Sequence, residues 1–142
     1  MQTSTEQIAP LGSHQFLDQL NLAYHREVAV RLLSDPQAVL SRARGNLSRW
    51  LAEYEDGDEP ACLVEWQQLL ETRTVKELVA ILIDDSDEGQ RLRSSTPFPG
   101  VLKSEERNEL FNYYESWAIA VHGEDAHSRP WIPRTPEQNV QA

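Results

Sequence analysis

The sequence of 142 residues has little of the material from which several common functional sites are built. It contains one cysteine, Cys62, so it can form neither an internal disulfide nor a cysteine-based zinc site. Its six glycines form neither a G-x-G-x-x-G nor a G-x-x-x-x-G-K-[ST] motif. The sequence therefore gives no sign of the glycine-rich loops that commonly bind nucleotide phosphates. Its longest apolar run covers residues 78–83, whereas a membrane-spanning helix needs about 18 or more apolar residues.

Basic residues are also scarce. Lys and Arg number 13 against 23 Asp and Glu, which gives a net charge of −10. Residues 1–50 hold five basic and four acidic side chains, whereas residues 51–142 hold eight and nineteen. Phosphate binding depends on Lys and Arg, so the excess of acidic residues argues against a protein that binds nucleic acid over its whole surface. The asymmetry indicates either two faces with different partners or solvated helix faces that happen to be acidic.

Apolar residues recur at helical spacing along most of the chain. Helices are expected over residues 14–33, 36–54, 63–70 and 75–83, over a short segment through residue 92, and over 105–121. Asp35 before Pro36 predicts one helix start, and Thr74 with Glu77 has the capping-box spacing of another. Ser104 is expected to cap the last helix.

No segment alternates with period two for long enough to predict a strand. We therefore expect an all-α protein: a compact bundle of five or six helices in residues 14–122, with a flexible lead-in over 1–13 and an extended, proline-containing tail over 123–142. Cys62, beside Ala61 and Leu63, is expected to be a small buried side chain. The N-terminus lacks the basic region and apolar core of a secretory signal, so a cytoplasmic location is expected.

Residues suited to catalysis or metal binding lack the necessary spacing. His122 and His127 stand five positions apart across Gly123, whereas a helical metal pair needs i, i+4 spacing. The acidic run over 84–88 lacks the glycine and distal Glu of a calcium loop. His25 is expected on a helix surface. The sequence thus predicts no cofactor, no metal and no catalysis, and an enzyme with an unrecognised acid pair in a cleft is an alternative.

Two groups of residues are candidates for contact with a protein partner. Glu55, Asp56, Asp58 and Glu59 form an acidic turn after the second expected helix. Trp131 and Ile132 are large apolar residues in a tail that is rich in proline. They are expected either to dock on the helical domain or to act as an aromatic anchor in a partner's groove.

A third group supports an alternative function. Arg42, Arg44 and Arg49 could form a basic face on the second expected helix and contact nucleic acid, as in a DNA-binding transcriptional regulator. No compact helix-turn-helix pattern precedes them, so an ordinary amphipathic helix with arginine on its polar side remains the other interpretation.

A longer pattern between residues 17 and 111 resembles a known family. It consists of Asp35-Pro36, Val39-Leu40, Ala43, Asn46-Leu47, Trp50, Glu65-Trp66, the run Arg-Leu-Arg-Ser-Ser-Thr-Pro-Phe-Pro-Gly-Val-Leu over residues 91–102, and Glu106-Arg107. The pattern resembles small helical bacterial proteins that are encoded beside toxin genes as antitoxin partners. The resemblance implies a non-catalytic protein that neutralises a cognate toxin by direct binding, and it carries no catalytic residues across.

Overall fold

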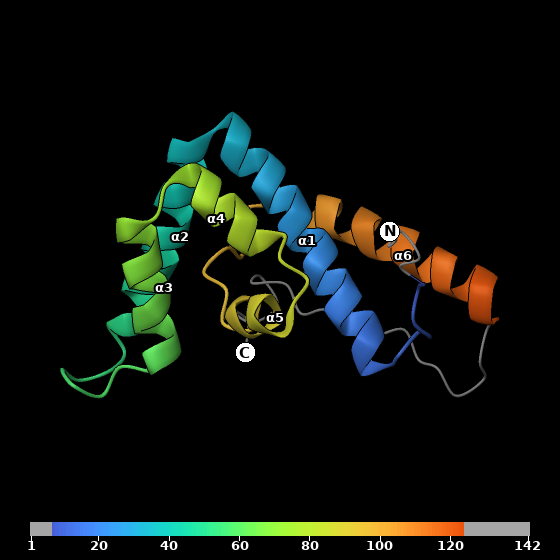
Figure 1. Ribbon diagram of the computed structural model, residues 1–142, viewed down its shortest axis with the longest axis horizontal. Helices are drawn as coiled ribbons and strands as arrows, with labels where there is room; N and C mark the ends of the chain where they lie inside the picture. The colour runs from blue at the N-terminus through green and yellow to red at the C-terminus, as the bar shows by residue number, and fades with distance from the viewer. Residues whose placement is uncertain (1–6, 124–142) are drawn as a thin grey trace.

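Six helices make up the regular structure of residues 7–123, the part of the chain that this computed structural model describes (Figure 1). The helices are α1 (His14–Ser34), α2 (Pro36–Leu51), α3 (Ala61–Thr72), α4 (Val75–Leu82), α5 (Asp87–Arg93) and α6 (Ser104–His122). No strand occurs in this range. The prediction of an all-α bundle of five or six helices is confirmed.

The longest helix, α1, lies at the centre of the arrangement. It contacts α2, α4, α5 and α6, and Figure 1 shows it running diagonally between the α2–α3 pair and α6. A helix that is covered on several sides buries residues around most of its circumference. This explains why α1 buries Phe16, Leu22 and His25, which do not share one narrow stripe.

Polar side chains fix two helix starts as the sequence predicts. Asp35 Oδ1 accepts a hydrogen bond from the N–H of Ala38 at 3.3 Å, and Pro36 stands at the first helical position. In the capping box of α4, the N–H of Glu77 donates to Thr74 Oγ1 at 3.1 Å. The Glu77 carboxylate accepts from the N–H of Thr74 at 2.9 Å, so the two residues satisfy each other's donors.

The start of α6 differs from the prediction. Ser104 is the first helical residue, and Lys103 occupies the capping position. The Glu106 carboxylate reaches back and accepts from the N–H of Lys103 at 2.8 Å. Glu106 stands three residues after Lys103, which is the spacing at which a carboxylate can satisfy this donor.

The core consists of two clusters. The larger is centred on Trp66 and Phe98, which are fully buried and meet edge-on with 5.7 Å between ring centroids. The indole N–H of Trp66 donates to the carbonyl of Leu92 at 2.8 Å, so this polar group is satisfied inside the core. The smaller cluster lies between α1 and α6 and includes Phe16 and Phe111, whose rings also meet edge-on.

The described part of the predicted lead-in, residues 7–13, packs against the helical domain. Ile8 is 3% exposed and packs into the smaller cluster. The Gln19 side chain accepts from the N–H of Ala9 at 2.8 Å and donates to the carbonyl of Gln7 at 2.7 Å. These contacts hold the segment before α1 on the helical domain. The Gln19 side chain satisfies backbone hydrogen-bonding groups of the segment, and the Ile8 side chain is buried away from water.

One side chain expected to be buried, Cys62, is exposed, and the second helix ends earlier than expected. The inward face of α3 runs through Leu63, Trp66 and Leu70. Cys62 stands one residue before this stripe and is exposed. The helix α2 ends at Leu51, so Tyr54 lies beyond its apolar stripe and is exposed as well.

Two helical glycines are expected to respond to alanine in opposite directions. At Gly89 an added Cβ would lie 2.0 Å from the carbonyl oxygen of Asp84, so Gly89→Ala should destabilise the fold by about 3 kcal/mol. At Gly45 nothing lies within 4 Å, so Gly45→Ala should stabilise it by roughly 0.5–1 kcal/mol through helix propensity. Denaturant unfolding of both variants checks this, and a stable Gly89→Ala protein would contradict the α4–α5 geometry.

Candidate functional site

The loop between α2 and α3 carries the acidic residues predicted to contact a partner. We call Glu55, Asp56, Asp58 and Glu59 the acidic loop; the first three are exposed and Glu59 is half-buried. The chain turns at Gly57, whose φ of 92° favours glycine, and the N–H of Gly57 donates to the Glu59 carboxylate at 2.9 Å. Figure 1 shows the loop projecting away from the helices, which presents its carboxylates to solvent.

The charge of the acidic loop is not compensated locally. Within residues 7–123, none of its four carboxylates forms an ion pair. Other acidic side chains form ion pairs. Arg91 Nη2 lies 2.9 Å from Glu65 Oε2 and 2.7 Å from Glu88 Oε2, and hydrogen bonds from Arg91 lower the pKa of both carboxyl groups. A cluster of unpaired carboxylates produces a negative field that attracts a basic surface in solution.

Two of the three predicted arginines line a cleft that also contains basic residues from α6 and the segment before it. Arg42 and Arg49 lie two turns apart on α2, and Lys103 and Arg107 line the same cleft, which has a volume of about 630 Å³. We call these four residues the basic cleft. Glu105 is the one acidic residue among the described residues that line it.

The α2 side of the basic cleft is held in place by Asn46, which is buried. The Asn46 side-chain amide donates to the carbonyls of Pro97 and Pro99, each at 2.9 Å. Its oxygen accepts from Arg49 Nη2 at 2.6 Å. One side chain therefore attaches the α5–α6 connector to α2 and positions an arginine at the cleft.

Arg44 does not belong to this surface. It lines a separate hollow between α2 and α3, with Leu70 and Glu71. Residues two positions apart on a helix point about 200° away from each other, so Arg42 and Arg44 face nearly opposite sides. The structure thus brings together Arg42 and Arg49 and separates Arg44 from them.

Sequence reasoning missed Lys103 and Arg107 as partners of the α2 arginines. The i, i+7 relation of Arg42 and Arg49 is readable in the sequence and places both on one side of a helix. No local pattern links them to the start of α6, because the connector path that brings α6 to α2 depends on the tertiary contacts of Asn46.

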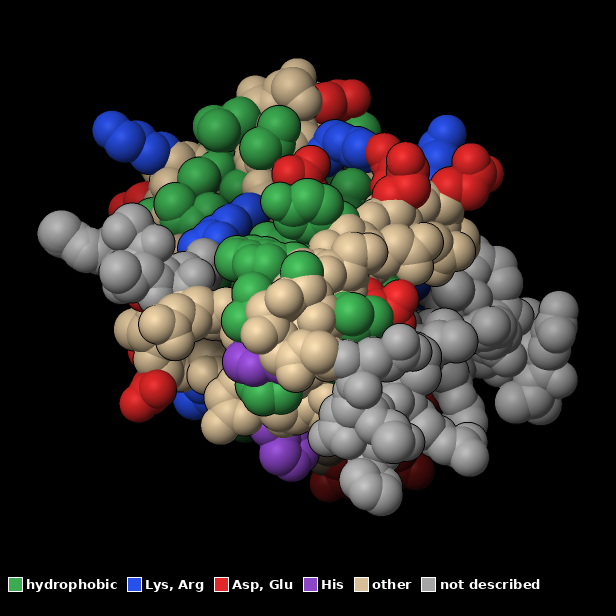
Figure 2. Space-filling view, turned by 90° about the vertical axis from the view of Figure 1, so that its right-hand side faces the viewer, with side chains coloured by type: hydrophobic (Ala, Val, Ile, Leu, Met, Phe, Trp, Pro, Cys, Tyr) green, Lys and Arg blue, Asp and Glu red, His purple; other side chains and the backbone are tan. Residues whose placement is uncertain are grey.

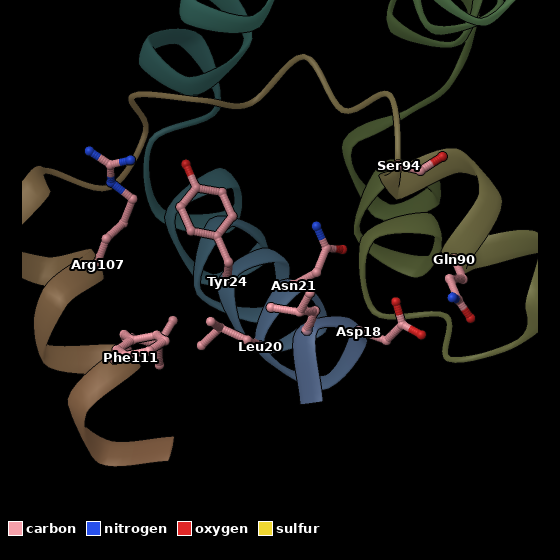
Figure 3. Close-up of a pocket in the computed structure, with 10 residues that line it drawn as sticks. Asp18, Leu20, Asn21, Tyr24, Gln90, Ser94, Arg107 and Phe111 are labelled. Atoms are coloured by element: carbon pink, nitrogen blue, oxygen red, sulfur yellow. The ribbon is translucent and has the colours of Figure 1, made fainter. Parts of the chain in front are cut away.

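An apolar pocket of about 410 Å³ lies between α1, α5 and α6. Figure 3 shows Leu20 and Phe111 facing each other across it, with the Tyr24 hydroxyl and the Arg107 guanidinium pointing toward the same end. The Tyr24 hydroxyl donates to the carbonyl of Phe98 at 2.7 Å, and burial raises the pKa of Tyr24. This hydroxyl therefore stays a hydrogen-bond donor at neutral pH. Arg107 lines both the pocket and the basic cleft.

Apolar side chains also reach the surface of the molecule. Figure 2 shows hydrophobic side chains gathered on the face at the α6 end, interrupted by basic and acidic groups. On α6 itself, Tyr113 is 65% exposed and Val121 is 56% exposed. Individually exposed apolar side chains are common on protein surfaces, so these two residues do not by themselves define a contact site.

His25 is fully buried, so the prediction of a surface position is wrong. Its Nδ1 lies 2.8 Å from the carbonyl oxygen of Asn21, and its Nε2 lies 2.7 Å from Thr96 Oγ1. A neutral ring with the proton on Nδ1 donates to the carbonyl and accepts from the hydroxyl. Burial lowers the pKa of His25 to about 4, which favours this neutral form. The buried Leu22 and Val28, three positions to either side, are the sequence signal for this burial.

Residues of the longer sequence pattern over 17–111 contribute to the packing of the fold. Trp66 packs against Phe98, and Asn46 holds the carbonyl of Pro97. The acidic loop lies between segments of this pattern and is not part of it. Trp66, Phe98 and Asn46 therefore have structural roles, whereas the acidic loop lies on the surface.

Three predicted residues cannot be placed. Trp131, Ile132 and His127 lie outside the described residues. His122 is described, and its Nε2 lies 2.6 Å from the carbonyl oxygen of Ile8. Within residues 7–123, no group of three His, Cys, Asp or Glu side chains is arranged to hold a metal ion.

Comparisons with protein-family models, with characterised proteins and with solved structures find no match to this chain. Among the helices of residues 7–123, none combines the length and the apolar character needed to cross a bilayer. Two charged surfaces, the acidic loop and the basic cleft, are the features of the described residues that bear on function.

Proposed function

We propose that this chain is a non-catalytic, cytoplasmic protein-binding module that neutralises a cognate bacterial toxin by direct contact. The acidic loop supplies the main contact surface, and Trp131 and Ile132 of the tail add apolar contacts. The observation that carries the proposal is the exposed acidic loop, whose four carboxylates have no ion-pair partner within the described residues.

Charge complementarity between the acidic loop and a basic active site supports this role. Enzymes that act on nucleic acids or nucleotides have basic active sites, since they bind phosphate groups. An acidic loop that occupies such a site excludes the substrate, and opposite charges accelerate the encounter. The loop projects from the helices, so it can enter a concave site without displacing the bundle (Figure 1).

Co-expression tests the proposal. The chain is produced together with the product of the adjacent gene in a host whose growth that product arrests. We expect growth to be restored and the two proteins to co-purify as a complex at moderate salt. Arrested growth together with the absence of a complex would refute a neutralising role.

A DNA-binding regulator is the second candidate, and the proximity of Arg42 and Arg49 to Lys103 and Arg107 favours it. A mobility shift with the promoter of its own gene at moderate salt tests this role. The double variant Arg42→Ala/Arg49→Ala should lose the shift, because these side chains would neutralise phosphates. An unchanged shift would exclude this surface as the DNA contact.

A further inference from the structure

We infer that the basic cleft is a binding site for a small phosphate-bearing ligand of nucleotide size. The inference is independent of the neutralising role, because the basic cleft and the acidic loop share no residue. It rests on the charge, the shape and the lining of the cleft.

The cleft concentrates positive charge on a protein that is strongly acidic overall. Arg42, Arg49, Lys103 and Arg107 converge on it, against Glu105 alone among its described acidic lining residues. The neighbouring Glu106 is engaged elsewhere, since its carboxylate pairs with Arg31 and accepts from the N–H of Lys103. Charges more than about 10 Å away are largely screened at physiological salt, so the local positive field persists despite the net charge of −10.

The two α2 arginines of the cleft, Arg42 and Arg49, retain hydrogen-bond donors for a ligand. Arg42 makes no hydrogen bond or ion pair within residues 7–123, and it lies beside Gly100, where an alanine Cβ would come within 3.4 Å of Nη1. Arg49 uses one nitrogen on Asn46 and retains its other donors. Planar guanidinium groups with several donors suit the oxygens of a phosphate.

Size and lining select the class of ligand. A cleft of about 630 Å³ falls in the range of sites that hold small molecules of nucleotide size. Trp50 lines the same cleft and is half-buried, so its indole offers a flat surface for an aromatic base. Duplex DNA fits less well, because reading its major groove requires a protruding element, and Arg42 and Arg49 line a hollow.

Binding of adenosine monophosphate to the full chain, measured by titration calorimetry, tests the inference, with inorganic phosphate and adenosine as the two component probes. We expect the nucleotide to bind more tightly than phosphate, and adenosine to bind least. The variant Arg42→Gln/Lys103→Gln should bind the nucleotide at least about tenfold more weakly, since it loses two charge-assisted contacts. The matched variant Arg44→Gln/Lys76→Gln removes two exposed charges outside the cleft and should bind like the wild type.

Absence of nucleotide binding at millimolar concentration would overturn the inference, as would equal binding by the two double variants. Binding of duplex DNA that the Arg42→Gln/Lys103→Gln variant loses, together with no binding of the nucleotide, would overturn it in favour of the regulator. Helical circular dichroism of each variant confirms folding, and the four substituted residues lie outside the core clusters. Intact toxin neutralisation by Arg42→Gln/Lys103→Gln would separate this site from the acidic loop.

Discussion

Replacing Phe98 with alanine is expected to reduce the free energy of unfolding by about 3–5 kcal/mol. Phe98 is fully buried and packs edge-on against both Trp66 and His25. The connector that carries it also supplies the carbonyl that accepts from Tyr24. Truncation leaves a cavity at the point where α1, α3 and the connector meet, and chemical denaturation measures the loss.

The control for this substitution is Leu33→Ala. Leu33 is 61% exposed, so its truncation should change the unfolding free energy by less than about 0.5 kcal/mol. A loss of less than about 1 kcal/mol for Phe98→Ala would contradict the packing described for the larger cluster.

Lowering the pH from about 6.5 toward 4 should destabilise the fold by up to about 3 kcal/mol through His25. The folded protein keeps this ring neutral, with a pKa of about 4, whereas the unfolded chain takes up a proton near pH 6.5. The unfolded state therefore binds more protons in this window. The stabilisation is complete above pH 6.5 and is lost as the pH falls toward 4.

Unfolding by urea at several pH values between 4.5 and 7 measures this effect. His25→Gln should have a lower stability at pH 7 and a much flatter pH dependence, because the titrating group is gone. His14→Gln removes an exposed histidine of the same helix and should retain the slope. An unchanged slope in His25→Gln would show that another group causes the pH dependence.

Helix positions could be predicted because their determinants are local. The capping box of Thr74 and Glu77 forms as expected, and Pro36 begins α2 behind Asp35. Such signals depend only on residues within one helical turn. Helix α6 begins one residue earlier than the sequence predicts, since the Glu106 carboxylate accepts from the N–H of Lys103.

Burial was harder to predict, because it depends on what covers each helix. The spacing of apolar residues in α1 predicts a helix with one apolar stripe. In the structure four helices contact α1, and His25 is buried as a result. Ile8 precedes the helix and is buried by contacts with α1 and α6 that are distant in sequence. Cys62 has apolar neighbours and yet lies outside the inward stripe of α3.

The two candidate sites also differ in whether the sequence alone could predict them. The acidic loop consists of residues that are close together in the chain, so the sequence is sufficient to predict it. The basic cleft joins α2 to the start of α6, and half of its cations lie on each side. Only the tertiary path of the connector shows that Arg42 and Arg49 meet Lys103 and Arg107 while Arg44 faces elsewhere.

Titration of the purified toxin partner into three forms of the full chain tests the central claim most directly. The first form is the wild type, and the second has all four carboxylates of the acidic loop replaced by amides. The third is Glu27→Gln/Glu71→Gln/Asp85→Asn/Glu109→Gln, which removes the same charge from exposed positions outside the loop.

We predict that the acidic-loop variant binds about 100-fold more weakly than the wild type, which corresponds to about 2.7 kcal/mol. The matched variant should stay within about threefold of the wild type, since remote surface charges are screened. Equal affinity of the acidic-loop variant and the wild type would contradict the claim that this loop is the contact surface.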